Sequence, residues 1–335
     1  MTGRCLPPSR AICLAWKTAP EMSTPTIRIG TRRSQLALWQ THHVLDRLHA
    51  AHPQLAVEVV HMTTTGDRIL DRPLPEIGGK GLFTQELEDA LRAGEIDLAV
   101  HSLKDLPTAM PPGFALGAVL SRANPFDALI SRDGHTLETL PDGATVGTSS
   151  LRRRAQLLAA RPDLRTESLR GNVDTRLRKA LDPAGPYAAI VLAVAGLERL
   201  ERQDVIGQVL PAEIMLPAPG QGAIAVQCRA GDDSILARLA ALDDRATRLA
   251  VTAERAFLEK LDAGCRLPVS AYATLDGDML RLAGRVSGLD GVQTITVSGT
   301  APAADSYALG ARLAAEALDQ GADDLLAAVR GGLPA

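Results

Sequence analysis

Three consecutive arginines, Arg152 to Arg154, directly follow a Thr-Ser-Ser run in the segment GTSSLRRRAQLL, residues 147–158. A serine placed before an apolar periodic stretch is typical of a helix N-cap. A helix N-terminus already carries about half a positive charge, so each arginine in its first turn costs about 0.3–1 kcal/mol unless an anion lies nearby. The segment therefore predicts an anion at the start of this helix.

Arginine outnumbers lysine over residues 147–179, and its planar guanidinium matches carboxylates and phosphates better than an ammonium does. Some of these arginines have the pattern of an ordinary solvated helix face: Arg154, Arg161, Arg165 and Arg178. Others flank the turns of TSSLRR and LRGNVDTR: Arg152, Arg153, Arg170 and Arg176. Turns bring side chains and N–H groups toward ligands, so the second group predicts an anion-binding site.

Asp105, in the segment HSLKDLP, is a single carboxylate among these many cations. It can form an ion pair with Lys104 or cap a helix, which is the usual role of a lone aspartate. It can also stabilise a cation that forms on a substrate, or carry a proton to a leaving group. The residues alone leave both interpretations open.

The cysteines are far apart and form no C-x-x-C pair, so they indicate neither a disulfide framework nor a metal site. We interpret them as free thiols of a cytoplasmic protein. Cys228 lies in the apolar run AIAVQC and is expected in the core. Cys265 follows Gly264 in a turn, where an exposed thiol is an oxidation liability. Cys265 is therefore the candidate nucleophile or attachment point.

The composition limits the classes of partner. The chain has 335 residues, of which 46% are hydrophobic, enough for two or three domains with separate cores. A net charge of -3 and an aromatic content of 3% argue against nucleic-acid binding. No apolar run approaches the roughly 18 residues of a membrane span. Residues 1–25 have an apolar part shorter than a signal peptide requires, and we expect a disordered extension or a start-site artefact, with Met22 as an alternative start.

The elements that must position these residues repeat one plan. TIRIGTRRSQLALWQ predicts a short strand, a Gly-Thr turn and a helix that begins near Ser34. ATVGTSSLRRRAQLL follows the same order, although so short a similarity can arise by chance. EIDLAVHSLKDLP and PYAAIVLAVAGLERL predict buried parallel strands. Four candidates fall beyond strand ends, where open α/β sheets bind ligands: Arg32, Asp105, Arg152 and Arg199.

From about residue 243 the pattern changes to a helix, two hairpins with Asp-Gly turns and a last helix, which predicts a small α+β domain. We therefore expect one α/β lobe from residues 26–120 with 221–240, a second from 126–215, and a C-terminal α+β domain over 243–335.

Eight segments, taken in order, resemble the porphobilinogen deaminase (hydroxymethylbilane synthase) family: RIGTRRSQLALWQ, GGKGLFTQELE, DLAVHSLKDLP, VGTSSLRRRAQL, LRGNVDTRL, LAVAGLERL, LPAPGQGAIAVQCR and TAERAFLEKLDAGCRLP. The resemblance covers residues 27 to about 330. Ala263 departs from it, because the family commonly has a second glycine there, and a methyl group at this position favours a negative φ in the local turn.

The resemblance implies a transferase of tetrapyrrole, porphyrin and haem biosynthesis. Its fold would be two periplasmic-binding-protein-like lobes, with mixed sheets flanked by helices, plus a small C-terminal α+β domain. It implies a dipyrromethane cofactor on Cys265 through a thioether, and Asp105 as the catalytic residue. The residues that bind cofactor and substrate carboxylates would be Arg32, Ser34, Lys104, Thr148, Ser150, Arg152, Arg153, Arg170, Arg176 and Arg199.

The implied reaction accounts for the arginines. Each porphobilinogen ring bears an acetate and a propionate, and charge-assisted hydrogen bonds of about 1.5–3 kcal/mol each outweigh the helix-dipole penalty. Loss of ammonia leaves a cationic azafulvene, which the bound chain attacks, and Asp105 would serve the cation and the proton transfer. Four additions and a hydrolysis would release hydroxymethylbilane to a downstream cyclising enzyme.

Two other classes of protein compete with this reading. A two-lobed anion-binding protein without chemistry would share the fold but would not need Cys265. An RNA-binding protein that uses residues 147–179 is opposed by the acidic charge and the scarce aromatics. We expect a monomer that binds neither nucleic acid nor membranes. We also expect that leucine at positions 152 and 153 leaves the stability of the cofactor-free protein unchanged or raised.

Overall fold

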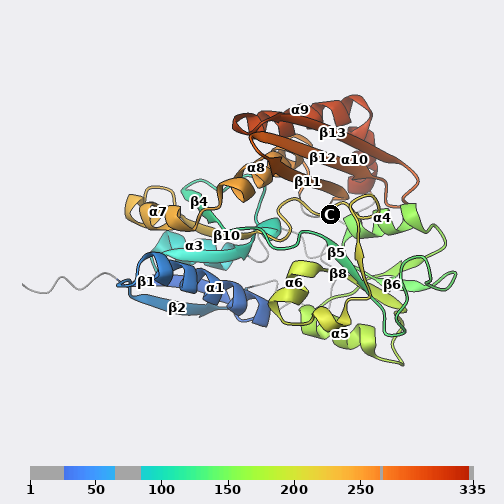
Figure 1. The fold of residues 1–335 in the computed structure, drawn as a ribbon, viewed down its shortest axis with the longest axis horizontal. Coiled ribbons are helices and arrows are strands. Elements are labelled where there is room, and N and C mark those ends of the chain that lie inside the picture. The colour runs from blue at the N-terminus through green and yellow to red at the C-terminus, as the bar shows by residue number, and fades with distance from the viewer. Residues whose placement is uncertain (1–25, 65–83, 265–266, 332–335) are drawn as a thin grey trace, which may run out of the picture.

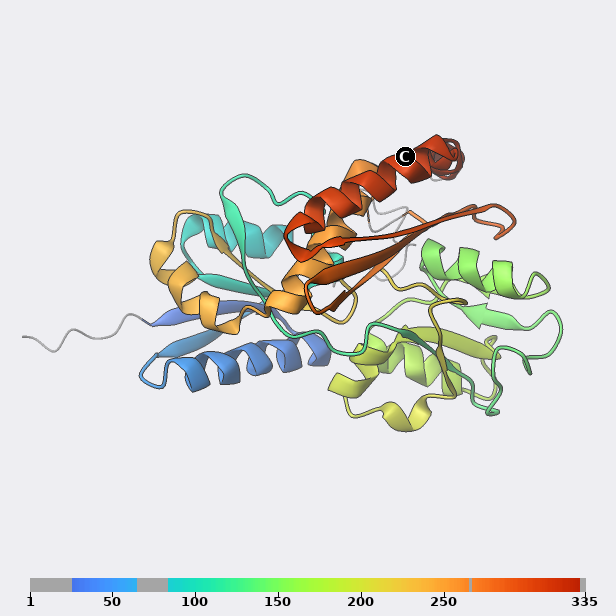
Figure 2. The same ribbon diagram turned by 45° about the horizontal axis from the view of Figure 1, so that its top comes forward.

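The computed structural model describes residues 26–64, 84–264 and 267–331. Its strands form two five-stranded sheets and one three-stranded sheet. Figures 1 and 2 show two lobes side by side, each around one of the larger sheets, with the C-terminal elements lying over the junction between them. The predicted class, two α/β lobes plus a small α+β unit, is confirmed.

The first sheet has the order β2-β1-β3-β10-β4, with β10 antiparallel to both of its neighbours. Its strands are β1 (Ile27–Arg32), β2 (Val57–Met62), β3 (Leu98–Ser102), β4 (Phe114–Val119) and β10 (Ile224–Arg229). The helices of this lobe are α1 (Gln35–Ala51), α3 (Gln85–Ala93) and α7 (Asp233–Leu239), followed by a 3-10 turn at Ala240–Leu242.

The second sheet has the order β7-β6-β8-β5-β9, with β5 antiparallel to both of its neighbours. Its strands are β5 (Asp127–Ile130), β6 (Thr145–Gly147), β7 (Arg165–Glu167), β8 (Ala189–Ala193) and β9 (Gln208–Leu210). Its helices are α4 (Leu151–Ala160), α5 (Val173–Leu181) and α6 (Val194–Arg199), with a 3-10 turn at Gln203–Val205. The two sheets thus share one plan, in which the fourth strand in order is supplied by a segment that crosses from the other lobe.

Strand β8 shows why an unbroken apolar run forms a strand here. Ile190 and Leu192 belong to one hydrophobic cluster, whereas Ala189 and Val191 belong to another. Because successive side chains of a strand point to opposite faces, the run fills cores on both sides of the sheet. β8 therefore lies inside the lobe, and the helix that directly follows it, α6, contacts α1 of the other lobe.

The C-terminal unit is an antiparallel sheet packed against helices. It consists of α8 (Arg245–Lys260), β11 (Val269–Asp276), β12 (Met279–Ser287), β13 (Thr294–Pro302), a 3-10 turn at Ala303–Asp305, α9 (Ser306–Asp319) and α10 (Ala322–Gly331). The predicted helix and both hairpins are present. The prediction of one last helix is wrong, because the chain forms two, separated at Gly321, whose φ of 93° is a left-handed conformation that favours glycine.

Serines cap the two corresponding helices, as the sequence predicted. Ser34 Oγ accepts a hydrogen bond from the Ala37 N–H at the start of α1, and Ser150 Oγ accepts one from the Arg153 N–H at the start of α4. Each helix thus begins directly after the carboxyl end of the second strand in its sheet order. Among the described helices, none combines the length and apolar character needed to cross a bilayer.

Candidate active site

The anion at the start of α4 is an internal carboxylate, Asp127. Arg152 Nη2 lies 2.7 Å from Asp127 Oδ2, and Arg153 Nη2 lies 2.6 Å from Asp127 Oδ1. The two arginines are only 5% and 6% exposed, and Asp127 is fully buried. Burial alone would raise the pKa of Asp127, but the charges of Arg152 and Arg153 hold it well below its usual range.

Both arginines also donate to backbone carbonyls, Arg152 to Leu216 O at 2.8 Å and Arg153 to Val191 O at 2.9 Å. These buried contacts argue against the expectation that leucine at both positions leaves the cofactor-free protein at least as stable. Removing both arginines would leave the buried charge of Asp127 uncompensated, at a cost that outweighs any relief at the helix dipole. The sequence did carry a signal for Asp127, because an aspartate at the start of the buried strand DALI must be paired.

Gln221 connects this cluster to the first lobe. Its Nε2 donates to Asp127 Oδ1 at 3.0 Å, and its Oε1 accepts from Lys104 Nζ at 3.1 Å. Burial and the neighbouring charge of Arg153 lower the pKa of Lys104 to about 8. Sequence reasoning missed Gln221, although it follows Gly220, whose φ is 73° in the turn that leads into β10.

Asp105 ends a 3-10 turn, Leu103–Asp105, that directly follows β3. Its side chain is exposed, and within the described part of the chain it forms no ion pair with Lys104, which donates to Gln221. Nor does it cap a described helix. With Arg32, Ser34 and Gln40 it lines a small pocket of about 70 Å³ at the end of β3. The contacts of the described residues thus support neither an ion pair of Asp105 with Lys104 nor a role of Asp105 as a helix cap.

Arg176, in α5, faces the same region from the second lobe. Its Nε donates to Gly171 O at 2.8 Å. Burial and the charge of Arg153 lower its pKa to about 10, while the charge of Asp105 acts in the opposite direction. Asp105 and Arg176, which belong to different lobes, are therefore close enough to interact electrostatically. Arg170 precedes the Gly171 turn and is another neighbouring charge that lowers the pKa of Arg176.

Thr148 and Ser150 hold the start of α4. The Thr148 N–H donates to Glu167 O at 2.8 Å, and Thr148 Oγ1 accepts from the Ser150 N–H at 3.2 Å. Among the arginines predicted to form a solvated helix face, Arg161 instead caps α4 and pairs with Asp163 at 2.8 Å, and Arg165 lies in β7. The other two, Arg154 and Arg178, are exposed helix residues, as expected.

Arg199 lies apart from the Asp127 cluster. It is the last residue of α6, not a residue directly beyond a strand end, and its Nη2 donates to Gly222 O at 2.6 Å. Its guanidinium lies 5.6 Å from the ring centre of Trp39 in α1. Burial lowers its pKa to about 10. The structure therefore places Arg199 where the two lobes and the returning segment meet.

Cys265 lies outside the described residues. Just before it, Asp262 has the left-handed backbone, with φ 45°, whereas Ala263 is 3% exposed and packs in the C-terminal core. An alanine is therefore accommodated at position 263. The Thr108 hydroxyl lies 3.5 Å from Ala263 O, and Arg255 Nη2 donates to Pro107 O at 2.6 Å. The loop after Asp105 is thus tied to α8 and to the turn that leads to Cys265.

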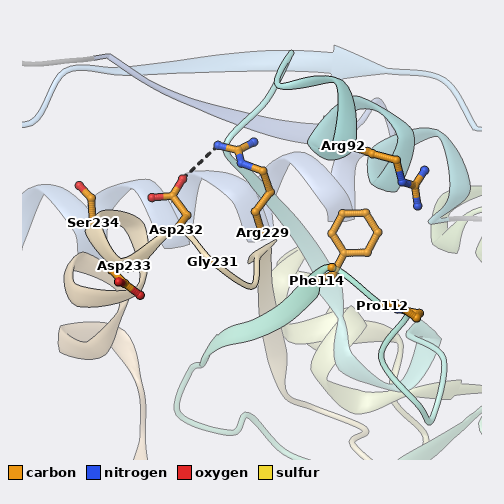
Figure 3. Close-up of a pocket in the computed structure, with 9 residues that line it drawn as sticks. Arg92, Pro112, Phe114, Arg229, Gly231, Asp232, Asp233 and Ser234 are labelled. Carbon is orange, nitrogen blue, oxygen red and sulfur yellow. Dashed lines mark hydrogen bonds and ion pairs between the residues drawn. The ribbon is translucent and has the colours of Figure 1, made fainter.

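A larger pocket of about 610 Å³ lies elsewhere in the first lobe and contains none of the predicted site residues (Figure 3). Arg229 lies in it, but Arg229 Nη2 pairs with Asp97 at 2.9 Å and with Asp232 at 3.1 Å. Arg92 pairs with Asp89 at 2.7 Å. Because nearby carboxylates already neutralise these cations, the smaller pocket beside Asp105 is the better candidate.

Comparison with known proteins decides the family. Residues 27–237 match "Porphobilinogen deaminase, dipyromethane cofactor binding domain", and residues 248–319 match "Porphobilinogen deaminase, C-terminal domain". A porphobilinogen deaminase of Roseiflexus castenholzii is 55% identical over 90% of this chain and 99% of its own length. The chain belongs to the porphobilinogen deaminase family. A second relative, the porphobilinogen deaminase of Brevibacillus brevis, is 52% identical over 90% of this chain and 97% of its own.

Among solved structures, the BenM effector binding domain with its effector benzoate covers 64% of this chain and 88% of its own, with 15% identity and a TM-score of 0.39. The family matches confirm the resemblance, the transferase class and the dipyrromethane cofactor of porphobilinogen deaminases predicted from the sequence.

The described residues fit an acidic pyrrole cofactor. Lys104, Arg152, Arg153 and Arg176 bring four cations together, and Asp105 and Asp127 are the carboxylates among them. Asp127 is already paired with Arg152 and Arg153, so the site keeps an excess of positive charge. A positive, half-buried site of this kind favours the carboxylates that porphobilinogen rings carry.

Proposed function

We propose that this member of the porphobilinogen deaminase family condenses four porphobilinogen molecules head to tail, with Asp105 as the catalytic residue and Cys265 as the cofactor attachment point. The single observation that carries the assignment of Asp105 is its place: an exposed carboxylate in a pocket, electrostatically coupled to Lys104 and Arg176 but paired with neither among the described contacts. Cys265 is assigned by the family resemblance.

Binding of the substrate carboxylates falls to the cations around this pocket. Arg32 and Ser34 lie on the first lobe, and Arg176 and Arg170 on the second, so a ring held between them contacts both lobes. Thr148 and Ser150 act on the second lobe by fixing the start of α4. Lys104 is anchored to Gln221 and can donate its remaining N–H groups to a carboxylate.

Arg152 and Arg153 contribute differently from what the sequence predicts. Asp127 compensates one of their two charges, which leaves the cluster with a net charge of +1 before Lys104 is counted. They donate to Asp127 and to backbone carbonyls, and so supply a fixed, buried positive charge near Lys104. Charges fixed in this way stabilise a bound anion without further reorganisation. Arg199 supports the site from the junction of the lobes.

The reaction requires a group that stabilises one cation and then accepts one proton. When the C–N bond of the substrate's protonated aminomethyl group breaks, neutral ammonia leaves and the positive charge stays on the substrate. The Asp105 carboxylate stabilises that charge. The cofactor, when bound, supplies a pyrrole α-carbon as the nucleophile. After the new C–C bond forms, the α-proton on the pyrrole carbon that made the attack passes to Asp105, which restores the aromatic pyrrole.

After the fourth addition, hydrolysis releases linear hydroxymethylbilane, which keeps the hydroxyl group of the water. We propose that it passes to a downstream cyclising enzyme, and that the protein acts in the cytoplasm as a monomer without nucleic-acid or membrane partners. A negative overall charge supports the absence of a nucleic-acid partner.

The test is intact-mass spectrometry of the purified protein and of its Cys265→Ser variant. The wild type should carry an excess that matches two linked pyrroles, on the peptide that contains Cys265. The variant should fold but lack this excess, because a hydroxyl is a far poorer nucleophile than a thiol near neutral pH. An unchanged excess and normal turnover in the variant would overturn the attachment at Cys265.

A further inference from the structure

Three buried polar side chains form a chain of hydrogen bonds through the first lobe, and none of them belongs to the site residues assigned above. His101 Nε2 lies 3.0 Å from Gln227 Oε1, and Gln227 Nε2 lies 3.2 Å from Glu88 Oε1. The exposed fractions are 6% for His101, 0% for Gln227 and 5% for Glu88. They come from β3, β10 and α3, so three elements supply one connected chain.

The direction of these hydrogen bonds follows from the chemistry of the end groups. The Glu88 carboxylate can accept a hydrogen bond but cannot donate one. The same holds for Met110 Sδ, which lies 3.4 Å from Gln227 Nε2. The amide nitrogen of Gln227 must therefore face Glu88 and Met110, and its oxygen must face His101. An amide oxygen only accepts, so His101 carries its proton on Nε2.

The surroundings of His101 also keep the ring uncharged. Burial lowers the pKa of His101 to about 4, because the loss of hydration and the charge of Arg32 outweigh the hydrogen bond to Gln227. The charged groups around it are Arg32, the last residue of β1, Glu88 in α3 and Asp105 beyond β3. Near neutral pH the ring is therefore neutral, with a lone pair on Nδ1.

His101 lines the same small pocket as Asp105, Arg32 and Ser34. Its Nε2 is occupied by Gln227, and within the described part of the chain no residue makes a hydrogen bond to Nδ1. We propose that the Glu88–Gln227–His101 chain fixes His101 as a neutral acceptor, which receives an N–H group of the substrate beside Asp105. In this arrangement His101 is a binding residue, and Gln227 and Glu88 are positioning residues.

This inference deepens the proposed function and rests on the Asp105 pocket as the place of reaction. A porphobilinogen ring offers two kinds of donor, the pyrrole N–H and the ammonium of the aminomethyl group, whereas its carboxylates only accept. Arg32 selects the accepting end, and a neutral His101 selects the donating end. A protonated imidazole would instead repel the cation that forms when ammonia leaves.

The first test reads the ring directly, by ¹⁵N NMR of histidine-labelled protein without substrate. We expect the neutral Nε2–H form of His101 throughout about pH 6 to 8, the range in which an unperturbed histidine titrates. A dominant Nδ1–H form, or a protonated ring within that range, would overturn the inference.

The second test separates the acceptor from the hydrogen-bond chain with two matched variants. His101→Asn can place an acceptor near the position of Nδ1 but cannot reach Gln227, whereas His101→Gln can reach Gln227 but offers nothing near Nδ1. We expect kcat/KM to fall about 2- to 10-fold further in His101→Gln than in His101→Asn, the size of one neutral hydrogen bond. The reverse order would show that only the structural link matters and would overturn the inference.

The third test addresses Glu88 and uses Asp89→Asn, the same chemical change on the exposed face of α3, as its control. In Glu88→Gln the end group can donate as well as accept, so the Nδ1–H form of His101 should appear in the NMR spectrum, and Asp89→Asn should leave the spectrum unchanged. Glu88→Gln with a wild-type spectrum would overturn the role of Glu88. Failure of the proposed function would show itself separately, as normal ring addition by Asp105→Asn.

Discussion

Arg122 and Glu254 form a buried, two-point ion pair. Arg122 lies in one of the two crossings, the chain segments that lead from one lobe to the other, and Glu254 lies in helix α8 of the C-terminal domain. Nη1 and Nη2 of Arg122 lie 2.6 and 3.1 Å from the two carboxylate oxygens of Glu254, which is fully buried. Glu254 also accepts from the N–H of Gly220, on the returning crossing, at 2.7 Å and from the N–H of Ala273, in β11, at 2.8 Å. One carboxylate thus holds both crossings against the C-terminal domain.

Glu254→Gln should strongly destabilise the protein. The variant keeps the size of the side chain but leaves Arg122 without its charge partner, and breaking a buried pair typically costs about 3–5 kcal/mol. Urea unfolding of the holoenzyme measures this cost. Glu259→Gln, an exposed change on the same helix, is the control and should shift the free energy of unfolding little. If the urea midpoint of Glu254→Gln equals that of the control, Glu254 does not hold the two crossings against the C-terminal domain.

Arg153→Leu should also destabilise the cofactor-free protein, because Asp127 would lose one of its two guanidinium partners. Because Arg152 still compensates the charge of Asp127, we expect the loss of charge-assisted hydrogen bonds, about 1.5–3 kcal/mol in the free energy of unfolding, measured by urea denaturation. Arg154→Leu, an exposed residue on the same helix turn, is the matched control and should be close to neutral. Equal stabilities of the two variants would mean that Asp127 needs only one guanidinium.

These pairs show what the sequence could and could not predict. The strand ends and helix caps, such as Ser34 and Ser150, depend on neighbouring residues and were predicted. The partners of the buried charges are remote: Arg152 and Asp127 are 25 residues apart, and Arg122 and Glu254 are 132 apart. A local pattern indicates that an arginine needs an anion, but only the tertiary fold determines whether that anion is a ligand or another side chain.

Lys104 should give kcat/KM an alkaline limb. Its pKa is lowered to about 8, so the ammonium is present below that pH and is lost as the pH rises through it. Because the pH dependence of kcat/KM reports groups of the free enzyme, kcat/KM should fall above about pH 8. Lys104→Arg keeps the charge at alkaline pH, since a guanidinium does not titrate there, and should move this limb upward. An identical limb in both proteins would assign the titration to another group.

Asp105→Asn provides the sharpest test of the proposed catalytic residue. The change keeps the size and the hydrogen-bonding capacity of the side chain but removes the negative charge that stabilises the substrate cation and accepts the proton. If the charge acts in the transition state, turnover should fall by about 100- to 1,000-fold while substrate affinity changes little. Single-turnover incubation of the cofactor-loaded protein with porphobilinogen, read by mass as stepwise adducts, measures ring addition itself. Asp105→Glu retains the charge and should recover part of the rate, with the deficit set by the longer side chain in the pocket beside Arg32 and Ser34.

Near-normal ring addition by Asp105→Asn would mean that the exposed carboxylate is not needed for the chemistry. Another group of the same pocket would then have to stabilise the cation and accept the proton.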